Sequence, residues 1–149
     1  MKVIKGDPIL RSLVIKRTGQ LPLQFVGNLV AEVESSTGTS RNGGDAPDPD
    51  RWHRLQLYRA ESDASYVLAI EYRSNWRNEF PRSDCIQFTS PDDLAKALDE
   101  FNPLAGVVGF PTHAKYTLQQ QRLMRRVSES FYAALDTLLA EAEIAVSLS

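Results

Sequence analysis

The closest approach to a catalytic arrangement in this chain is an acidic residue, Asp50, followed by Glu71-Tyr72-Arg73. Nucleases that hold a divalent cation between separated carboxylates need an acid followed by a strand with the pattern Glu-x-Lys, and here arginine replaces the lysine. Glu71 is also expected to pair with Arg54 on a neighbouring strand, and Asp50 ends a segment expected to lack fixed structure. We therefore do not expect a nuclease of this type, and a small hydrolase or nuclease built from residues far apart in the sequence is the third hypothesis.

The histidines and the cysteine do not suggest a metal site or a nucleophile either. His53 and His113 each lack a second ligand at the i+3 or i+4 spacing that a shared element would provide. Cys85 follows Asp84, whose negative charge disfavours the thiolate that a cysteine nucleophile needs. We expect Cys85 to be a small core residue, and we expect no metal, no cofactor and no catalytic residue.

Arginines alternate with aromatic rings between residues 72 and 82. Arg73, Trp76, Arg77 and Arg82 could together stack bases and hold phosphates, which predicts contact with nucleic acid. The same mixture is typical of a strand end whose rings pack and whose arginines cover them. The net charge of −2 argues against a globally basic nucleic-acid binder, so nucleic-acid contact is the alternative function.

The order of charges along the last predicted helix is the strongest signal in the chain. Its first part is basic and its last part is acidic, although the helix dipole favours acids at the N-terminus and bases at the C-terminus. The basic residues are Lys115, Arg122, Arg125 and Arg126, and the acidic residues are Glu129, Asp136, Glu141 and Glu143. Two such helices would be complementary if they lay antiparallel.

We therefore predict a small non-enzymatic interaction or regulatory protein that forms a homodimer, or binds a protein partner, through this helix. The expected contact residues are Arg122, Arg125, Arg126, Glu129, Asp136 and Glu141.

The composition is that of an ordinary globular chain. Its 149 residues are 42% hydrophobic and 24% charged, which is consistent with a single domain over residues 1–149. No apolar run approaches the roughly 18–20 residues that would cross a bilayer, and the N-terminus lacks the apolar stretch of a signal peptide. Cys85 is the only cysteine, which suits a reducing compartment. We expect a cytoplasmic protein without membrane contact.

Strand patterns occupy the first ninety residues. Residues 10–17 are an apolar run that ends at the turn signal Thr18-Gly19, and a period-two segment follows over residues 21–34. The odd-numbered residues from Leu21 to Val33 are expected to share one face, and the two segments to form a hairpin. Residues 85–89 are a further short strand.

Residues 52–60 and 65–73 form the clearest hairpin. If Ala60 lies opposite Ser65, a single register aligns apolar pairs, an arginine–glutamate pair and a tryptophan–arginine pair. These pairs are Leu57–Leu68, Leu55–Ile70, Tyr58–Val67, Gln56–Ala69, Arg54–Glu71 and Trp52–Arg73.

Two helices follow the strands. Ser90-Pro91-Asp92-Asp93 supplies an N-cap, a first-turn proline and two acids for a helix that ends before Pro103. Thr117 and Gln120 form a capping box for the last helix, whose apolar residues recur at three- and four-residue steps. We predict an α+β fold: an antiparallel sheet of about five strands, made of two hairpins and a short strand, with two helices packed on one face.

Residues 35–50 consist mainly of Ser, Thr, Gly, Asp and Pro, and Ala46 is their only aliphatic side chain. Such a segment buries too little apolar surface to offset the entropy of ordering it. We expect a flexible loop.

Within residues 21–80, one pattern resembles a pattern of other proteins. Phe25-Val26-Gly27-Asn28-Leu29, followed by Leu57-Tyr58-Arg59, resembles the F-x-G-x-L strand and L-Y-R hairpin of small uncharacterised bacterial and phage proteins. Ala60 stands where that pattern usually has threonine. The resemblance implies an antiparallel sheet and a bacterial or phage defence or mobile-element setting, and it implies no catalytic residue.

Overall fold

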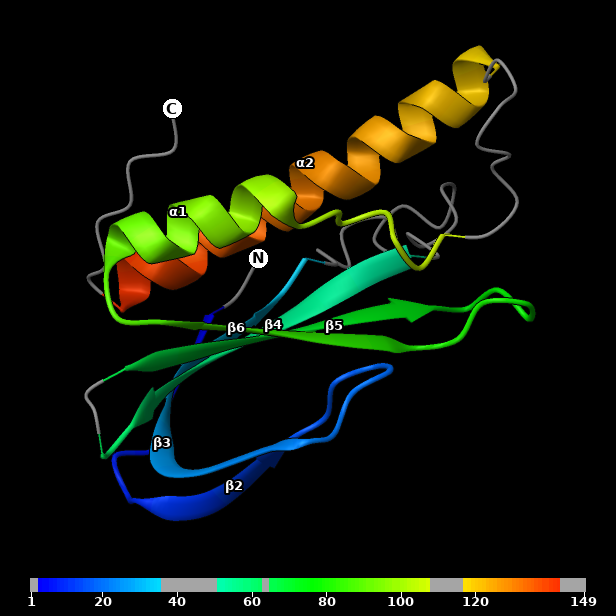
Figure 1. Cartoon of the computed structure of the whole chain (residues 1–149). Coiled ribbons are helices and arrows are strands. Elements are labelled where there is room, and N and C mark those ends of the chain that lie inside the picture. Colours follow the sequence, from blue (N-terminus) through cyan, green and yellow to red (C-terminus); the bar gives the residue numbers. More distant parts are fainter. Residues whose placement is uncertain (1–2, 36–50, 63–64, 108–116, 143–149) are drawn as a thin grey trace.

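A computed structural model describes residues 3–35, 51–62, 65–107 and 117–142. The strands are β1 (Val3–Lys5), β2 (Arg11–Ile15), β3 (Leu23–Glu34), β4 (Arg51–Ala60), β5 (Tyr66–Ser74) and β6 (Arg82–Phe88), and the helices are α1 (Pro91–Glu100) and α2 (Leu118–Glu141). All strands form one antiparallel sheet, and both helices cover one face of it (Figure 1). The predicted α+β fold is confirmed. The flexible loop predicted for residues 35–50 lies, except for Ser35, outside the described residues.

The sheet has the order β1-β3-β4-β5-β6, and β2 pairs with the first part of β3. β1 was not expected from the sequence, because three residues are too few to show a period. It pairs Val3 with Val33 and Lys5 with Ala31. A tertiary partner, rather than a local pattern, therefore determines this strand.

The β4–β5 hairpin has the predicted register. Leu57 lies opposite Leu68, Arg54 opposite Glu71 and Trp52 opposite Arg73. The partner of Arg54 differs from the expectation, because its guanidinium forms an ion pair of 2.7 Å with Glu32 on β3. A central strand has neighbours on both sides, so a register alone does not determine which neighbour a long side chain contacts.

The prediction that the odd-numbered residues of the 21–34 segment share one face is wrong. Leu29 lies opposite Tyr58, and Ala31 lies opposite Leu57, so the register shifts by one residue between them. Such a β-bulge moves the later side chains to the other face of the sheet. Ala31 consequently packs under the helices, whereas Leu29 packs on the opposite side.

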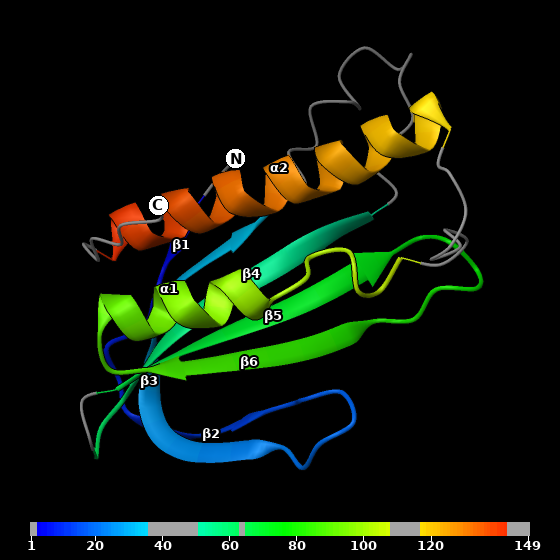
Figure 2. The same ribbon diagram turned by 45° about the horizontal axis from the view of Figure 1, so that its top comes forward.

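The bulge allows β3 to serve two apolar clusters. The larger cluster lies between the sheet and both helices and includes Leu55, Leu57, Leu68, Leu94, Phe131 and Leu135. The smaller cluster lies between the sheet and the β2–β3 hairpin, which curls beneath the sheet, and includes Ile15, Tyr58, Val67 and Ala69 (Figures 1 and 2). Gly27 is required where β3 passes β4, because a Cβ there would overlap the carbonyl oxygen of Arg59.

Candidate interaction surface

The outer helix α2 begins with the predicted capping box. The Thr117 hydroxyl accepts a hydrogen bond from the Gln120 amide, and the Gln120 side chain accepts one from the Thr117 amide. No acidic residue lies in the first turn and no basic residue in the last turn. The inverted charge order is therefore present on the helix itself.

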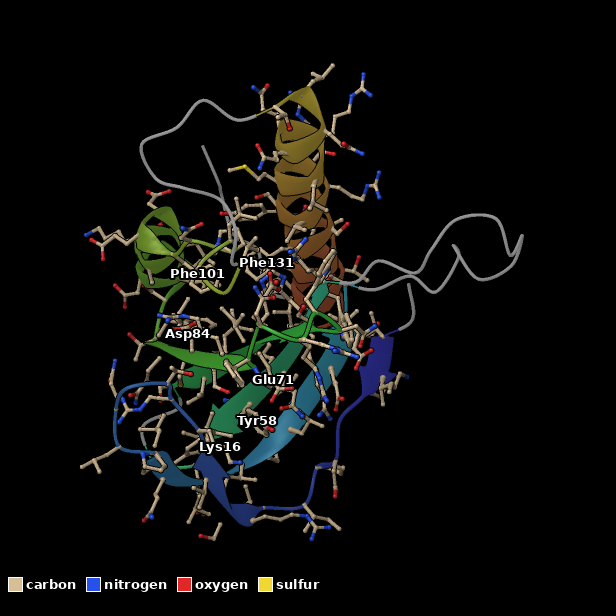
Figure 3. The ribbon with its side chains drawn as sticks, turned by 90° about the vertical axis from the view of Figure 1, so that its right-hand side faces the viewer. Lys16, Tyr58, Glu71, Asp84, Phe101 and Phe131 are labelled. Carbon is tan, nitrogen blue, oxygen red and sulfur yellow. The ribbon has the colours of Figure 1, made fainter. Side chains whose placement is uncertain are left out.

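Only the C-terminal part of α2 is anchored to the sheet. Its buried residues begin at Val127 and include Phe131, Leu135 and Leu138, whereas residues 118–126 contain no buried residue. Figure 1 shows this first part extending away from the sheet. Phe131 fills the space between the two helices, 5.2 Å from the ring of Phe101 (Figure 3).

Five of the six predicted contact residues lie on the face of α2 opposite its buried stripe. At 100° per residue, positions separated by three and four residues follow one line along a helix. That line contains Leu118, Arg122, Arg125, Glu129, Ala133, Asp136 and Ala140, all of them exposed. We call this line, together with the adjoining Arg126, the outer stripe. Glu141 lies to one side of the outer stripe.

The charges of α2 have no partners within the described part of the chain. No ion pair or hydrogen bond there involves the side chains of Arg122, Arg125, Arg126, Glu129, Asp136 or Glu141. Lys115 and Glu143, which belong to the same charge pattern, lie outside the described residues. The outer stripe thus has a basic and an acidic part, and no ion pair with a described residue neutralises either part.

Two arginines of the arginine–aromatic segment form ion pairs within the chain. Arg73 forms an ion pair with Glu71 at 3.2 Å, and Arg82 forms one with Asp84 at 3.2 Å. Arg77 is exposed and has no partner among the described residues. Arg73 and Arg82 are thus held beside acids, which leaves Arg77 as the uncompensated charge of this set.

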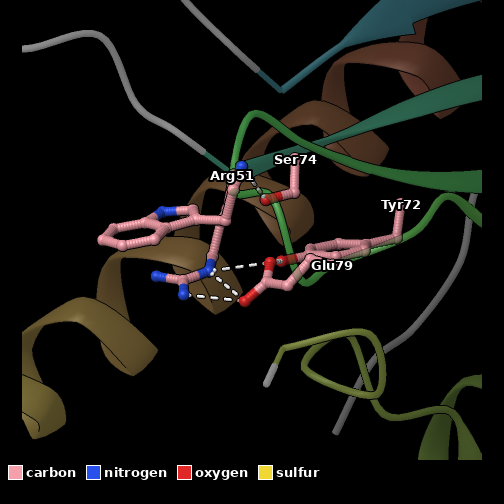
Figure 4. A network of polar contacts seen from close by, with 5 residues as sticks. Arg51, Tyr72, Ser74 and Glu79 are labelled. Carbon is pink, nitrogen blue, oxygen red and sulfur yellow. Dashed lines mark hydrogen bonds and ion pairs between the residues drawn. The ribbon is translucent and has the colours of Figure 1, made fainter. Parts of the chain in front are cut away.

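Trp76 from the same segment is held by a residue that sequence reasoning missed. The guanidinium of Arg51 lies 4.9 Å from the centre of the Trp76 ring. Its Nε and terminal nitrogen donate hydrogen bonds to the Glu79 carboxylate at 2.7–3.0 Å (Figure 4). The Tyr72 hydroxyl donates to the same carboxylate at 2.6 Å.

This Arg51–Glu79–Tyr72 cluster is buried at the end of the sheet. The side chain of Glu79 is 0% exposed and that of Arg51 is 7% exposed. Burial raises the pKa of Tyr72, and the hydrogen bond to Glu79 raises it further. For Arg51 burial acts to lower the pKa, but the hydrogen bond and ion pair with Glu79 outweigh it, so the pKa is raised. The sequence indicates this cluster only through Glu79, a glutamate in a turn rich in arginine and aromatic residues. Its partner Arg51 lies 28 residues away in the sequence, so the pair cannot be recognised from a local pattern.

His53 is also buried, beneath α2. Its Nε2 contacts the carbonyl oxygen of Pro103 at 2.9 Å, and its ring lies 4.9 Å from that of Phe131. Burial lowers the pKa of His53 to about 4, although the bond to Pro103 acts in the opposite direction. The ring is therefore neutral at physiological pH, with Nε2 donating and a buried Nδ1 without a partner among the described residues.

Cys85 and Glu71 are the other reactive candidates that the structure describes, and Arg54, the predicted partner of Glu71, is paired with Glu32 instead. Cys85 packs against the smaller apolar cluster, and burial raises its pKa to about 11, so the thiolate is disfavoured. Glu71 pairs with Arg73, while Asp50 and His113 lie outside the described residues. The described residues contain no group of three or more histidines, cysteines and acids placed to hold a metal ion.

Neither described helix is long and apolar enough to cross a membrane. No family model, curated protein or solved structure matches this chain.

Proposed function

We propose that this chain is a non-enzymatic interaction protein that pairs with a second copy of itself through the outer stripe of α2. The observation that supports the proposal is a row of exposed charges, basic then acidic, without partners among the described residues. Natural helices usually place such charges to complement their dipole, and this helix places them in the opposite order. In an antiparallel arrangement, the basic part of this helix would lie along the acidic part of the second copy.

One antiparallel register aligns the outer stripes of the two copies. If Arg122 lies opposite Asp136 of the second copy, Leu118 lies opposite Ala140 and Arg125 opposite Ala133. Glu129 then lies on the two-fold axis, with Arg125 and Arg126 of both chains one turn away. This arrangement is isologous, because each contact occurs twice.

The small residues of the stripe support a close approach of the two helices. Ala133 and Ala140 leave room for the longer side chains opposite them, and packed helices lie about 8–10 Å apart. Leu118 is 62% exposed in the isolated chain and would be covered by this contact. The helix is about 36 Å long at 1.5 Å per residue, and the stripe from Leu118 to Ala140 runs over about six turns.

The proposed pairing is expected to be moderate in affinity and sensitive to salt. Exposed ion pairs contribute about 0.2–1 kcal/mol each, and screening weakens them as the ionic strength rises. Pairing of the anchored part also needs no rearrangement of the core, since Val127, Phe131 and Leu135 face the sheet.

The test is the mass in solution, measured by light scattering after size exclusion at 50 mM and 500 mM salt. The chain is expected to be a dimer that dissociates at the higher salt. Arg122→Glu combined with Arg125→Glu and Arg126→Glu is expected to give a monomer at both. The matched control combines Lys5→Glu, Arg59→Glu and Lys96→Glu, which changes the net charge equally on exposed positions elsewhere. A monomeric wild-type chain at low salt would refute the proposal.

The alternative is contact with single-stranded nucleic acid through Arg73, Trp76, Arg77 and Arg82. Its support is that Trp76 is 48% exposed and Phe80, in the same turn, is 77% exposed, since exposed rings stack bases. Against it, Arg73 and Arg82 are already paired with acids. Titration with a labelled oligonucleotide at low salt separates the two: binding that Trp76→Ala removes and the α2 variant retains would favour nucleic acid.

A further inference from the structure

The outer edge of β6 has backbone groups without hydrogen-bond partners in the described part of the chain. The Thr18 amide donates a hydrogen bond of 2.7 Å to the Ser83 carbonyl oxygen, and the Ser83 amide donates one of 2.7 Å to the Thr18 hydroxyl. The peptide groups of Ser83 therefore point away from β5. Alternate residues of a strand point the same way, so the peptide groups of Cys85 and Gln87 also face outward, and neither has a hydrogen-bond partner among the described residues.

The β2–β3 hairpin forms a second wall beside this edge. It curls under the sheet and meets β6 at the Thr18–Ser83 contact, and β2 and β6 diverge from that point (Figure 1). A cavity of about 240 Å³ lies between them, lined by Ile15, Lys16, Tyr58, Ala69, Glu71 and Ser83. Figure 3 shows Lys16, Tyr58 and Glu71 on this side of the sheet, away from the helices.

The charges around the cavity are not balanced. Glu71 is paired with Arg73, and Asp84 is paired with Arg82. Lys16 lines the cavity and is exposed, and it has no ion pair among the described residues. Arg17 next to it donates to the carbonyl oxygen of Leu21 and has no ion pair with any residue that the structure describes. Within the described ranges, the mouth therefore carries uncompensated positive charge.

We propose that the free edge of β6 binds an extended segment of a partner protein that carries an acidic side chain. The segment adds a strand beside β6, with hydrogen bonds to the peptide groups of Cys85 and Gln87. One apolar side chain enters the cavity over Ala69, and the acidic side chain reaches Lys16. A second copy of this chain fits less well, because it would bring its own Lys16 and Arg17 to an already basic mouth. The site is separate from the outer stripe of α2.

The probe is a phage-displayed library of random ten-residue peptides, selected against the full chain, with the best peptide then synthesised and titrated. The recovered peptides are expected to alternate apolar and polar residues and to contain an acid. Amide hydrogen exchange, followed by NMR, is expected to slow at Cys85 and Gln87. Ile86 is the internal control, because its peptide groups already face β5.

Two pairs of variants test the contact geometry. Gln87→Pro removes an outward-facing amide without touching the β5–β6 ladder, and should weaken peptide binding by roughly tenfold, the effect of one lost hydrogen bond. Gln87→Ala should leave it unchanged. Lys16→Glu should weaken binding by roughly threefold or more, whereas Lys96→Glu on α1 should not.

Three results would overturn the proposal. These are a library without enrichment over an unrelated control protein, selected peptides that are basic, and exchange protection confined to residues outside β6. None of them bears on the α2 pairing, because the mass of the unliganded chain tests that pairing independently.

Discussion

The charges at the end of the sheet and the charges on the outer stripe of α2 have opposite fates in the same fold. Arg51 and Glu79 are removed from water and held against each other, with Tyr72 as a third member. Arg122, Arg125, Glu129 and Asp136 stay in solvent without an intramolecular partner among the described residues. A buried charge needs an intramolecular partner, because it has lost its hydration, whereas an exposed charge is solvated by water and can pair with another molecule. The first group is therefore structural, and the second is the group that the proposed pairing would use.

The largest expected effect comes from breaking the buried group. Glu79→Gln removes the carboxylate that faces Arg51 and should lower the free energy of unfolding by about 3–5 kcal/mol, because a buried guanidinium then loses its counter-charge. Urea denaturation measures this difference. Combining Arg51→Met with Glu79→Leu should recover most of the loss. If Glu79→Gln alone were as stable as the wild type, the buried ion pair would not contribute to the stability of the fold.

The next effect is the pH dependence of stability caused by His53. Its pKa falls from 6.5 in the unfolded chain to about 4 in the folded one, so the unfolded chain binds more protons between these values. Stability should therefore decrease as the pH falls from 6.5 to 4, by about 3 kcal/mol at full protonation of the unfolded residue. Denaturation curves at several pH values measure this slope, and His53→Gln should remove that part of it whatever its own stability.

A charge exchange sharpens the comparison on the outer stripe. Arg122→Asp should weaken the proposed dimer by roughly tenfold, since the two-fold axis makes each lost pair count twice. Adding Asp136→Arg in the same chain should restore it. Sedimentation equilibrium gives the dissociation constants. Equal weakening by the single and double variants would show that the pairing does not use this register.

The smallest expected effect concerns the dipole of α2. Gln119→Glu places an acid in a first turn that has none, and should raise the free energy of unfolding by about 0.3–1 kcal/mol. Gln119→Lys should lower it by a similar amount. Thermal denaturation at low salt, under conditions where the chain is monomeric, detects the difference, which 0.5 M salt should largely abolish.

The fold was predictable wherever a pattern is local. Ser90 and Thr117 act as N-caps as expected, and the pairing of residues 52–60 with 65–73 follows from one register. The bulge in β3 was not predictable, because Leu29 and Ala31 keep the alternation of the sequence while the extra residue moves them to opposite faces. β1 was not predicted, because this three-residue strand is determined by its pairing with Val33 and neighbouring residues of β3 and not by a local pattern.

The candidate sites divide in the same way. The charge order of α2 is visible along the chain, since residues three and four apart share a helix face whatever the tertiary structure. The Arg51–Glu79 pair and the free edge of β6 are not, because they depend on segments far apart in sequence meeting in space.

By itself, then, the sequence determined the helix ends, one hairpin register and a charge-polarised helix, all products of short-range geometry. Only the tertiary structure decided which charges are buried and which are exposed, because burial depends on what else packs against a residue.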